Sequence, residues 1–192
     1  MLKVMIVDND LKRSKPLKQS LIDNGFTVVA HIENTINLEA KCCEIKPDIV
    51  IIDTDSPNRD TLENICVMSM HDPRPVVMFT HDGNKEKIKA ATQAGVCAYV
   101  VGDIPSERLI PVIDAAVARF EEFKNLRAEL NIANTKLDER KIVERAKGLL
   151  MKQRQIDEEE AYSLLRNMAM KKNMKLADLS NQLVEAAKML II

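Results

Sequence analysis

The amino-terminal part of this 192-residue chain predicts an α/β fold, a doubly wound five-stranded parallel sheet. Short runs rich in β-branched residues alternate with helical segments, which is the pattern of strands joined by crossover helices. The runs 49–52 and 76–79 are apolar at nearly every position, as is typical of central strands covered on both faces. From residue 106 onward the pattern is helical, with one glycine, Gly148, and one proline, Pro111.

The elements of the sheet follow in order along the chain. The predicted strands are 4–7, 27–32, 49–52, 76–79 and 98–101, and the predicted helices between them are 11–24, 38–45, 60–70 and 85–94. Gly25 and Gly95 stand directly after the first and fourth helices, and Pro47 and Pro73 lie just beyond the second and third. These residues are common helix stop signals.

The next element is a long helix that carries a short heptad pattern. Its start, 109–117, is expected to pack on the sheet. A helix of about 40 residues, at a rise of 1.5 Å per residue, is longer than a small domain, so its later turns are expected to extend beyond the sheet. Apolar residues repeat there at spacings of three and seven, with two more beside the same seam: Phe120, Phe123, Leu130 and Leu137, then Leu126 and Ala133. The seam predicts a coiled coil between two copies, and therefore a homodimer.

Two further helices complete the chain. Asp157 can cap the first of them, and Glu160 stands three residues later, as in a capping box. A break at 171–173 leads to a last helix with apolar residues on one side: Leu176, Leu179, Leu183, Ala187 and Leu190. We therefore expect a domain at 1–117, a coiled-coil linker helix at 118–136 and a three-helix bundle at 137–192.

Composition limits the possible functions. The 28 basic and 29 acidic residues argue against a protein that coats nucleic acid through bulk charge. The average hides a division, because residues 1–110 carry 13 basic and 16 acidic side chains, whereas residues 136–175 carry 11 and 7. The aromatic content of 3%, without Trp, predicts that RNA, if bound, is read with little base stacking on rings.

Cysteine usage and hydropathy indicate the compartment. The four cysteines show no metal-ligand spacing and are too few for a disulfide scaffold, so we expect small buried side chains in a reducing compartment: Cys42, Cys43, Cys66 and Cys97. No stretch approaches the roughly 18 apolar residues that a membrane span needs. The chain is therefore expected in the cytoplasm.

Polar residues gather where the predicted strands end. Asp8, Asn9 and Asp10 follow the first strand, Asp53 the third and Thr80 the fourth. Ligand sites in open parallel sheets form at these strand ends. Two carboxylates, Asp8 and Asp53, could hold Mg²⁺ there, and Asp53 could accept a phosphoryl group.

These residues resemble a response-regulator receiver domain, which has a flavodoxin-like fold, over 1–117. The match is carried by Asp8, Asp53 with Pro57 four residues later, Thr80 and Tyr99. The resemblance implies that Asp53 is the phosphoacceptor, Thr80 the switch hydroxyl and Tyr99 the switch aromatic. It assigns no catalytic residue, so an enzyme is not expected.

Two departures from the receiver pattern weaken the phosphate chemistry. Asn9 stands where the family has a second metal-binding carboxylate, with Asp10 beside it, and Gly102 stands where the family has a lysine that pairs with the phosphorylated acid. Loss of that cation removes a charge-assisted hydrogen bond. Asp53 is then a vestigial acceptor in a receiver-like module under the control of a bound protein, and Mg²⁺ is an optional ligand.

A basic stripe runs along the end of the long helix. Lys141, Arg145, Gly148 and Lys152 are spaced by four, three and four, opposite a buried stripe made of Ile142, Val143, Ala146, Leu149 and Leu150. Glycine inside a helix costs roughly 1 kcal/mol relative to alanine. Either Gly148 allows tight helix packing beside a solvated face, or it lets another molecule approach closely.

The carboxyl-terminal segment resembles an ANTAR domain over 137–192, through the motifs 146–151, 160–161, 165–166 and 169–170. The resemblance implies an RNA-binding antiterminator that recognises paired hairpins in leader mRNA. Candidate RNA-binding residues carried over are Arg140, Lys141, Arg145, Lys147, Gly148, Met151, Lys152, Arg166, Lys171 and Lys172. Met151 and Ala146 are equally compatible with core positions.

The whole arrangement is similar to NasT-type regulators, with the segments 52–57 and 74–80 as the closer match. This resemblance implies antitermination of nitrate and nitrite assimilation genes, a NasS-like nitrate/nitrite sensor protein as partner, and an indirect effect on RNA polymerase. Two alternatives stay open. One is a DNA-binding response regulator with a helix-turn-helix near 157–190, although the last helix carries few cations. The other is a protein-interaction adaptor.

Overall fold

The computed structural model describes residues 1–8, 14–102 and 105–190 and contains one five-stranded parallel sheet. The strands are β1 (Lys3–Val7), β2 (Thr27–Ile32), β3 (Ile49–Asp53), β4 (Val76–Thr80) and β5 (Ala98–Val101). Their order is β2-β1-β3-β4-β5, and every neighbouring pair is parallel. The predicted doubly wound fold is confirmed, and the two most apolar predicted strands, β3 and β4, lie inside the sheet.

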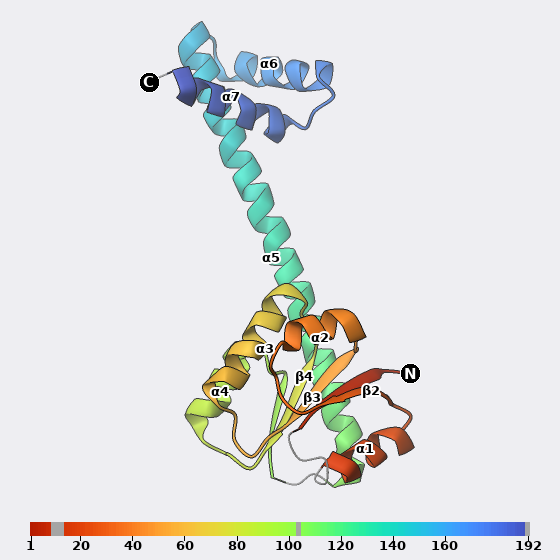
Figure 1. Cartoon of the computed structure of the whole chain (residues 1–192). Helices are drawn as coiled ribbons and strands as arrows, with labels where there is room; N and C mark the ends of the chain where they lie inside the picture. The colour runs from red at the N-terminus through yellow and green to blue at the C-terminus, as the bar shows by residue number, and fades with distance from the viewer. Residues whose placement is uncertain (9–13, 103–104, 191–192) are drawn as a thin grey trace. The chain divides into compact units, whose positions relative to one another are not determined.

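Helices cover both faces of this sheet (Figure 1). They are α1 (Ser14–Asp23), α2 (Leu38–Ile45), α3 (Arg59–His71) and α4 (Lys85–Ala94), followed by α5 (Ser106–Arg154). Met5 and Val7 point into a core with α2, α3 and α4, whereas Val4 and Ile6 point into a core with α1 and the start of α5. Residues 11–13 of the first predicted helix lie outside the described residues.

Local sequence signals explain where these helices begin and end. Asn58 caps α3 by accepting a hydrogen bond from the Thr61 amide, and Asn84 caps α4 in the same way. Gly95 ends α4 with φ 109°, and a side chain there would place its Cβ 2.3 Å from the Ser69 hydroxyl oxygen. Glycine is therefore required at this turn for both backbone and packing reasons.

The long helix α5 spans 49 residues, longer than the expected length. Its first turns bury Leu109, Ile113 and Ala116 against the sheet, as predicted. Every residue from 121 to 140 is then exposed within the single chain. The chain forms two compact units, Met1–Lys124 and Asn125–Ile192, and the domain boundaries expected at 117 and 136 stay predictions.

Two helices, α6 (Glu158–Lys171) and α7 (Leu176–Leu190), pack with the end of α5 in the second unit. The Asp157 carboxylate accepts the Glu160 amide at 2.8 Å, which confirms the predicted cap of α6. Ala146, Leu165 and Leu179 form the centre of a separate apolar core. The side chain of Leu190, predicted on the apolar face of α7, lies outside the described residues.

The cysteines differ in burial. All four are free thiols; Cys42 is buried, Cys66 and Cys97 are half-buried, and Cys43 is exposed. The expectation of four buried side chains is therefore wrong for Cys43. No helix in the described ranges has both the length and the apolar character needed to cross a membrane.

Candidate functional site

The predicted polar edge of the sheet is present. Register pairs Val7 with Ile52 and Asp53 with Phe79, so Asp8, Asp53 and Thr80 follow one another across β1, β3 and β4. Asp8 and Thr80 are buried, and Asp53 is half-buried. Asn9 and Asp10 lie outside the described residues, so their part in the pocket stays a prediction.

The metal chemistry of this edge depends on the same acids. Asp8 and Asp53 supply carboxylate oxygens, the ligand type that Mg²⁺ prefers. Within 1–8, 14–102 and 105–190, no cluster of three or more acids, histidines or cysteines is arranged to hold a metal ion. Binding of Mg²⁺ by Asp8 and Asp53 stays a prediction, and further ligands would have to be water, backbone or substrate oxygens.

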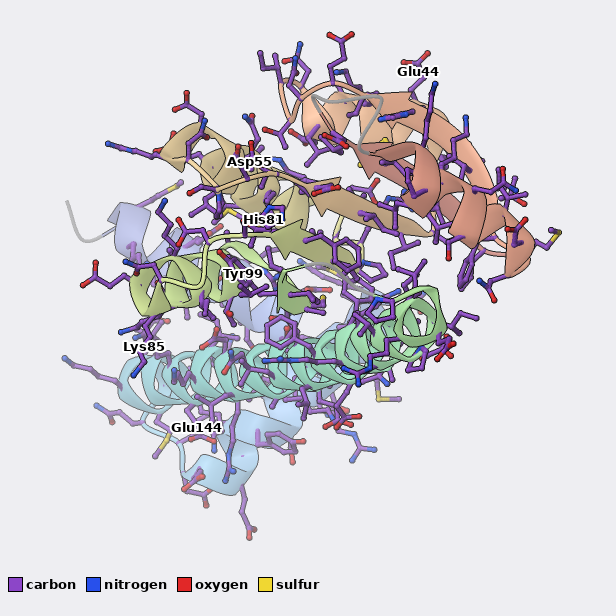
Figure 2. The ribbon with its side chains drawn as sticks, turned by 90° about the horizontal axis from the view of Figure 1, so that it is seen from below. Glu44, Asp55, His81, Lys85, Tyr99 and Glu144 are labelled. Carbon is purple, nitrogen blue, oxygen red and sulfur yellow. The ribbon has the colours of Figure 1, made fainter. Side chains whose placement is uncertain are left out.

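The two switch residues are hydrogen-bonded to neighbouring loops. The Thr80 hydroxyl donates to the Asp55 carbonyl oxygen at 2.8 Å and accepts from the Asp82 amide at 3.2 Å. The Tyr99 hydroxyl donates to the Asp82 carbonyl oxygen at 2.7 Å. Figure 2 shows Asp55, His81 and Tyr99 along this edge, and His81 Nδ1 lies 3.8 Å from Asp55 Oδ1. Both predicted switch side chains are thus held in one arrangement by the loops after β3 and β4.

A polar clasp formed by Ser56, Asp82 and Lys87 joins these loops. The Lys87 ammonium lies 2.7 Å from Asp82 Oδ2 and also donates to the Ser56 hydroxyl. Ser56 in turn donates to Asp82 Oδ2 at 2.7 Å. The hydrogen bond from Lys87, followed by that from Ser56, holds the pKa of Asp82 well below its usual range.

The sequence interpretation missed this clasp. Gly102, at the family's lysine position, takes φ +85°, a backbone conformation that disfavours a side chain. Lys87 instead brings a cation to the strand ends from the first turn of α4. The one local signal in the sequence was the Asn84 cap, which fixes where α4 begins and so places Lys87 in its first turn. The contact of Lys87 with Ser56 could not be predicted, because the two residues are 31 positions apart in the sequence.

The basic stripe of the second unit is solvent-exposed as predicted. Lys141, Arg145, Gly148 and Lys152 are all exposed, and Arg140 is exposed beside them. A Cβ built on Gly148 meets no atom of the described residues within 4 Å, apart from its own helix backbone and chain neighbours. Tight helix packing among the described residues therefore does not explain the glycine.

Lys147 differs from the other basic residues of the predicted RNA-binding set because its side chain is buried. Its side chain is only 8% exposed, and its ammonium lies 2.8 Å from Glu144 and 2.6 Å from Glu158. The hydrogen bond to Glu144 raises the pKa of Lys147 most, and the hydrogen bond to Glu158 raises it further. The residue joins α5 to the first turn of α6, which gives it a structural role, and its contact with RNA stays a prediction.

The other candidates divide between core and surface. Met151 is half-buried and packs against the second core, and Ala146 is fully buried, so the core alternative applies to both. Arg166, Lys171 and Lys172 are exposed on α6 and directly after it. Tyr162, which the sequence interpretation did not single out, is also exposed on α6.

Taken together, a parallel sheet with an acid and hydroxyl edge, followed by a separate helical unit, defines a response regulator with an output domain. The family model of the response regulator receiver domain matches residues 4–114, and that of the ANTAR domain matches residues 133–184. The chain therefore belongs to the response regulators that carry an ANTAR domain. This family is regulatory and non-enzymatic, as the sequence predicts.

Relatives and solved structures agree with this assignment. The transcriptional regulatory protein PdtaR of Mycobacterium tuberculosis is 30% identical over 168 residues, covering 88% of this chain and 82% of PdtaR. The chemotaxis protein CheY of Listeria monocytogenes is 31% identical over 117 residues, covering 60% of this chain and 98% of CheY. The signal receiver domain of a diguanylate cyclase from Desulfovibrio desulfuricans G20 superposes with a TM-score of 0.56 at 18% identity, covering 63% of this chain and 97% of that domain, which supports the fold alone.

The clasp predicts that the stability of the first unit depends on pH. Because folding lowers the pKa of Asp82, its stabilising effect is complete above the ordinary value of 3.8 and is lost as pH falls through the lowered value. Lys87→Ala is expected to lower the melting temperature of the first unit at neutral pH, with a difference from wild type that shrinks in acid. Thermal unfolding across the pH range measures this difference.

Lys85→Ala is the matched control, since Lys85 is an exposed lysine in the same turn of α4. If Lys85→Ala lowered the melting temperature as much as Lys87→Ala, the stabilising role of the clasp would be contradicted. The same holds if the melting-temperature difference between Lys87→Ala and wild type did not change with pH.

Proposed function

We propose that this protein is a transcription antiterminator that binds paired hairpins in leader mRNA through α5 and α6. The observation that carries the proposal is Gly148, an exposed helical glycine without a packing partner among the described residues, set between Arg145 and Lys152. Glycine lowers helix stability, so a surface glycine at this place is consistent with close approach of another molecule. Cations on both sides favour a polyanion.

RNA is favoured over duplex DNA by the charges on the helices. A recognition helix normally carries Arg or Lys near its start, but α7 begins with Asp178 in its first turn and has Lys188 in its last. Hairpin loops present unpaired bases that side chains can reach outside a groove. Binding of duplex DNA, or of neither nucleic acid, would instead support the DNA-binding or adaptor alternatives.

We propose that a sensor protein of the NasS kind, responding to nitrate or nitrite, holds the regulator until the signal arrives. RNA polymerase would be affected indirectly, and the protein would act in the cytoplasm. Asn9 and Gly102 replace two groups that phosphate chemistry uses, which supports partner control with Asp53 as a vestigial acceptor. The nitrate signal and the target genes rest on the resemblance to NasT-type regulators.

The same proposal includes a homodimer through the linker helix at 118–136. Large apolar side chains are exposed along the seam of α5, with Phe123 63% and Leu130 59% exposed. Glu122 and Arg127 flank this seam five residues apart, the spacing at which opposite charges meet between parallel coiled-coil helices. A second copy is therefore the occupant that best matches the pattern, and pairing would bring two RNA-binding units together for two hairpins.

Removal of the basic stripe tests RNA binding. Lys141→Ala/Arg145→Ala/Lys152→Ala is expected to weaken binding to a two-hairpin leader RNA by about 100-fold, because three phosphate contacts are lost. In the same variant, the slope of log affinity against log salt concentration should become shallower by roughly two to three, because fewer counterions are released on binding. Gel-shift titrations at several salt concentrations, with duplex DNA in parallel, measure both effects.

The control removes the same charge from the first unit, as Lys15→Ala/Lys18→Ala/Lys85→Ala, all exposed positions. Equal weakening by the control would show nonspecific attraction, and tight binding to duplex DNA without RNA preference would overturn the proposal.

Gly148→Ala separates binding from stability. Alanine adds a methyl group in open space and improves helix propensity, so the free energy of unfolding of the second unit should rise by about 0.5–1 kcal/mol. The RNA affinity should fall by about 10-fold, because the methyl group keeps the ligand from the helix surface. Chemical denaturation and gel shift measure the two quantities, and unchanged affinity in a stabilised variant would contradict the role of Gly148.

Charged residues in the seam test the homodimer. Leu130→Lys/Leu137→Lys is expected to raise the dimer dissociation constant by on the order of 100-fold, because buried apolar contacts are replaced by like charges. Sedimentation equilibrium measures this change. Ile132→Lys is the control, since Ile132 is 56% exposed but lies off the seam. A wild-type monomer at high concentration would contradict the dimer.

A further inference from the structure

An exposed stripe on α6 is not explained by the core of the second unit. Glu158, Tyr162, Arg166 and Met170 are spaced by four residues and are all exposed. The neighbouring positions Ala161, Leu165 and Ala169 make the buried contacts of this helix. Tyr162 remains 44% exposed, in a chain with two tyrosines, four phenylalanines and no tryptophan.

The contacts of Lys147 locate this tyrosine relative to the basic stripe. The Lys147 ammonium lies 2.6 Å from Glu158, so the first turn of α6 lies against α5 at the residue before Gly148. Helical side chains lean toward the preceding turn, so we expect the Tyr162 ring to lean toward the turn that contains Glu158. Glu158, one turn before Tyr162, thus contacts the residue next to Gly148.

The end of α5 and the exposed stripe of α6 together present three kinds of chemical group. Gly148 leaves the helix backbone open, Arg145 and Lys152 supply positive charge, and Tyr162 supplies a flat ring with a polar hydroxyl. Arg166 lies one turn further along α6 from Tyr162 and adds an exposed guanidinium group. Aromatic rings stack on unpaired bases, and guanidinium groups bind phosphate or stack on bases as well.

We propose that Tyr162 stacks on an unpaired loop base of the bound RNA, with Arg166 beside it contacting the backbone of the same loop. The inference rests on the proposed function and specifies which part of the RNA the site reads. The low aromatic content predicts little stacking of bases on rings. The inference departs from this prediction at one position only, because a single ring can stack on a single base. The occupant is a loop nucleotide, since bases in a duplex are already stacked on each other.

Fluorescence titration of the full-length protein tests this contact. The probe is a two-hairpin leader RNA with 2-aminopurine in the loop. Tyr162→Ala is expected to weaken binding by about 10- to 100-fold and to abolish the quenching of the probe, whereas Tyr162→Phe keeps the ring and stays within about 3-fold of wild type. Met170→Ala, at a position 70% exposed on the same stripe, is the control and should match wild type.

An RNA with an abasic loop position adds a second readout. It should bind wild type and Tyr162→Ala equally, because the stacking partner is absent. If wild type binds the RNA and Tyr162→Ala binds equally well with full quenching, the stacking inference is overturned and the proposed function stands. If Tyr162→Phe is as weak as Tyr162→Ala, ring stacking is also overturned. If wild type binds no hairpin RNA, both the inference and the proposed function are overturned.

Discussion

The continuity of α5 is the constraint on which the rest of the structure depends. Its first turns bury Leu109, Ile113 and Ala116 in the core on one face of the sheet, and its last turns bury Ala146 and Leu150 in the core of the second unit. One helix thus completes two cores. The exposed residues 121–140 lie between them, so the apolar seam follows the first core and the basic stripe overlies the second.

The receiver edge carries a cation although the family's lysine position is a glycine. Gly102 brings no side chain to the site, whereas Lys87 brings an ammonium group from α4 to Asp82 and Ser56. The carbonyl oxygen of Asp82 also accepts the Tyr99 hydroxyl, and its amide donates to Thr80. The clasp therefore holds the loop that binds both switch residues.

Much of this could be predicted from the sequence because it depends on local patterns. Strand alternation, helix stop signals and the Asp157 cap are encoded within a few residues, and all three match the structure. Gly148 could be recognised as unusual, but its helix alone could not show whether another helix packed on it. That answer required the position of every neighbouring element.

The features that the sequence did not predict involve contacts between distant residues. Lys147 follows Ala146 in a basic segment, and its burial depends on Glu158 in the next helix, 11 residues away. Lys87 and Ser56 meet across 31 residues, on opposite sides of β4 in the sequence. The exposure of Tyr162 depends on how α6 packs against α5, which the periodicity of α6 does not determine.

Terminator read-through during transcription in vitro tests the central claim most directly. The template carries a two-hairpin leader followed by a terminator, and the assay compares wild-type protein with Gly148→Ala, which is expected to be the better folded of the two. The account predicts that wild type increases full-length transcript on this template, that Gly148→Ala increases it much less, and that deletion of one hairpin removes the effect. Unchanged read-through with wild type, or equal read-through with Gly148→Ala, would contradict it.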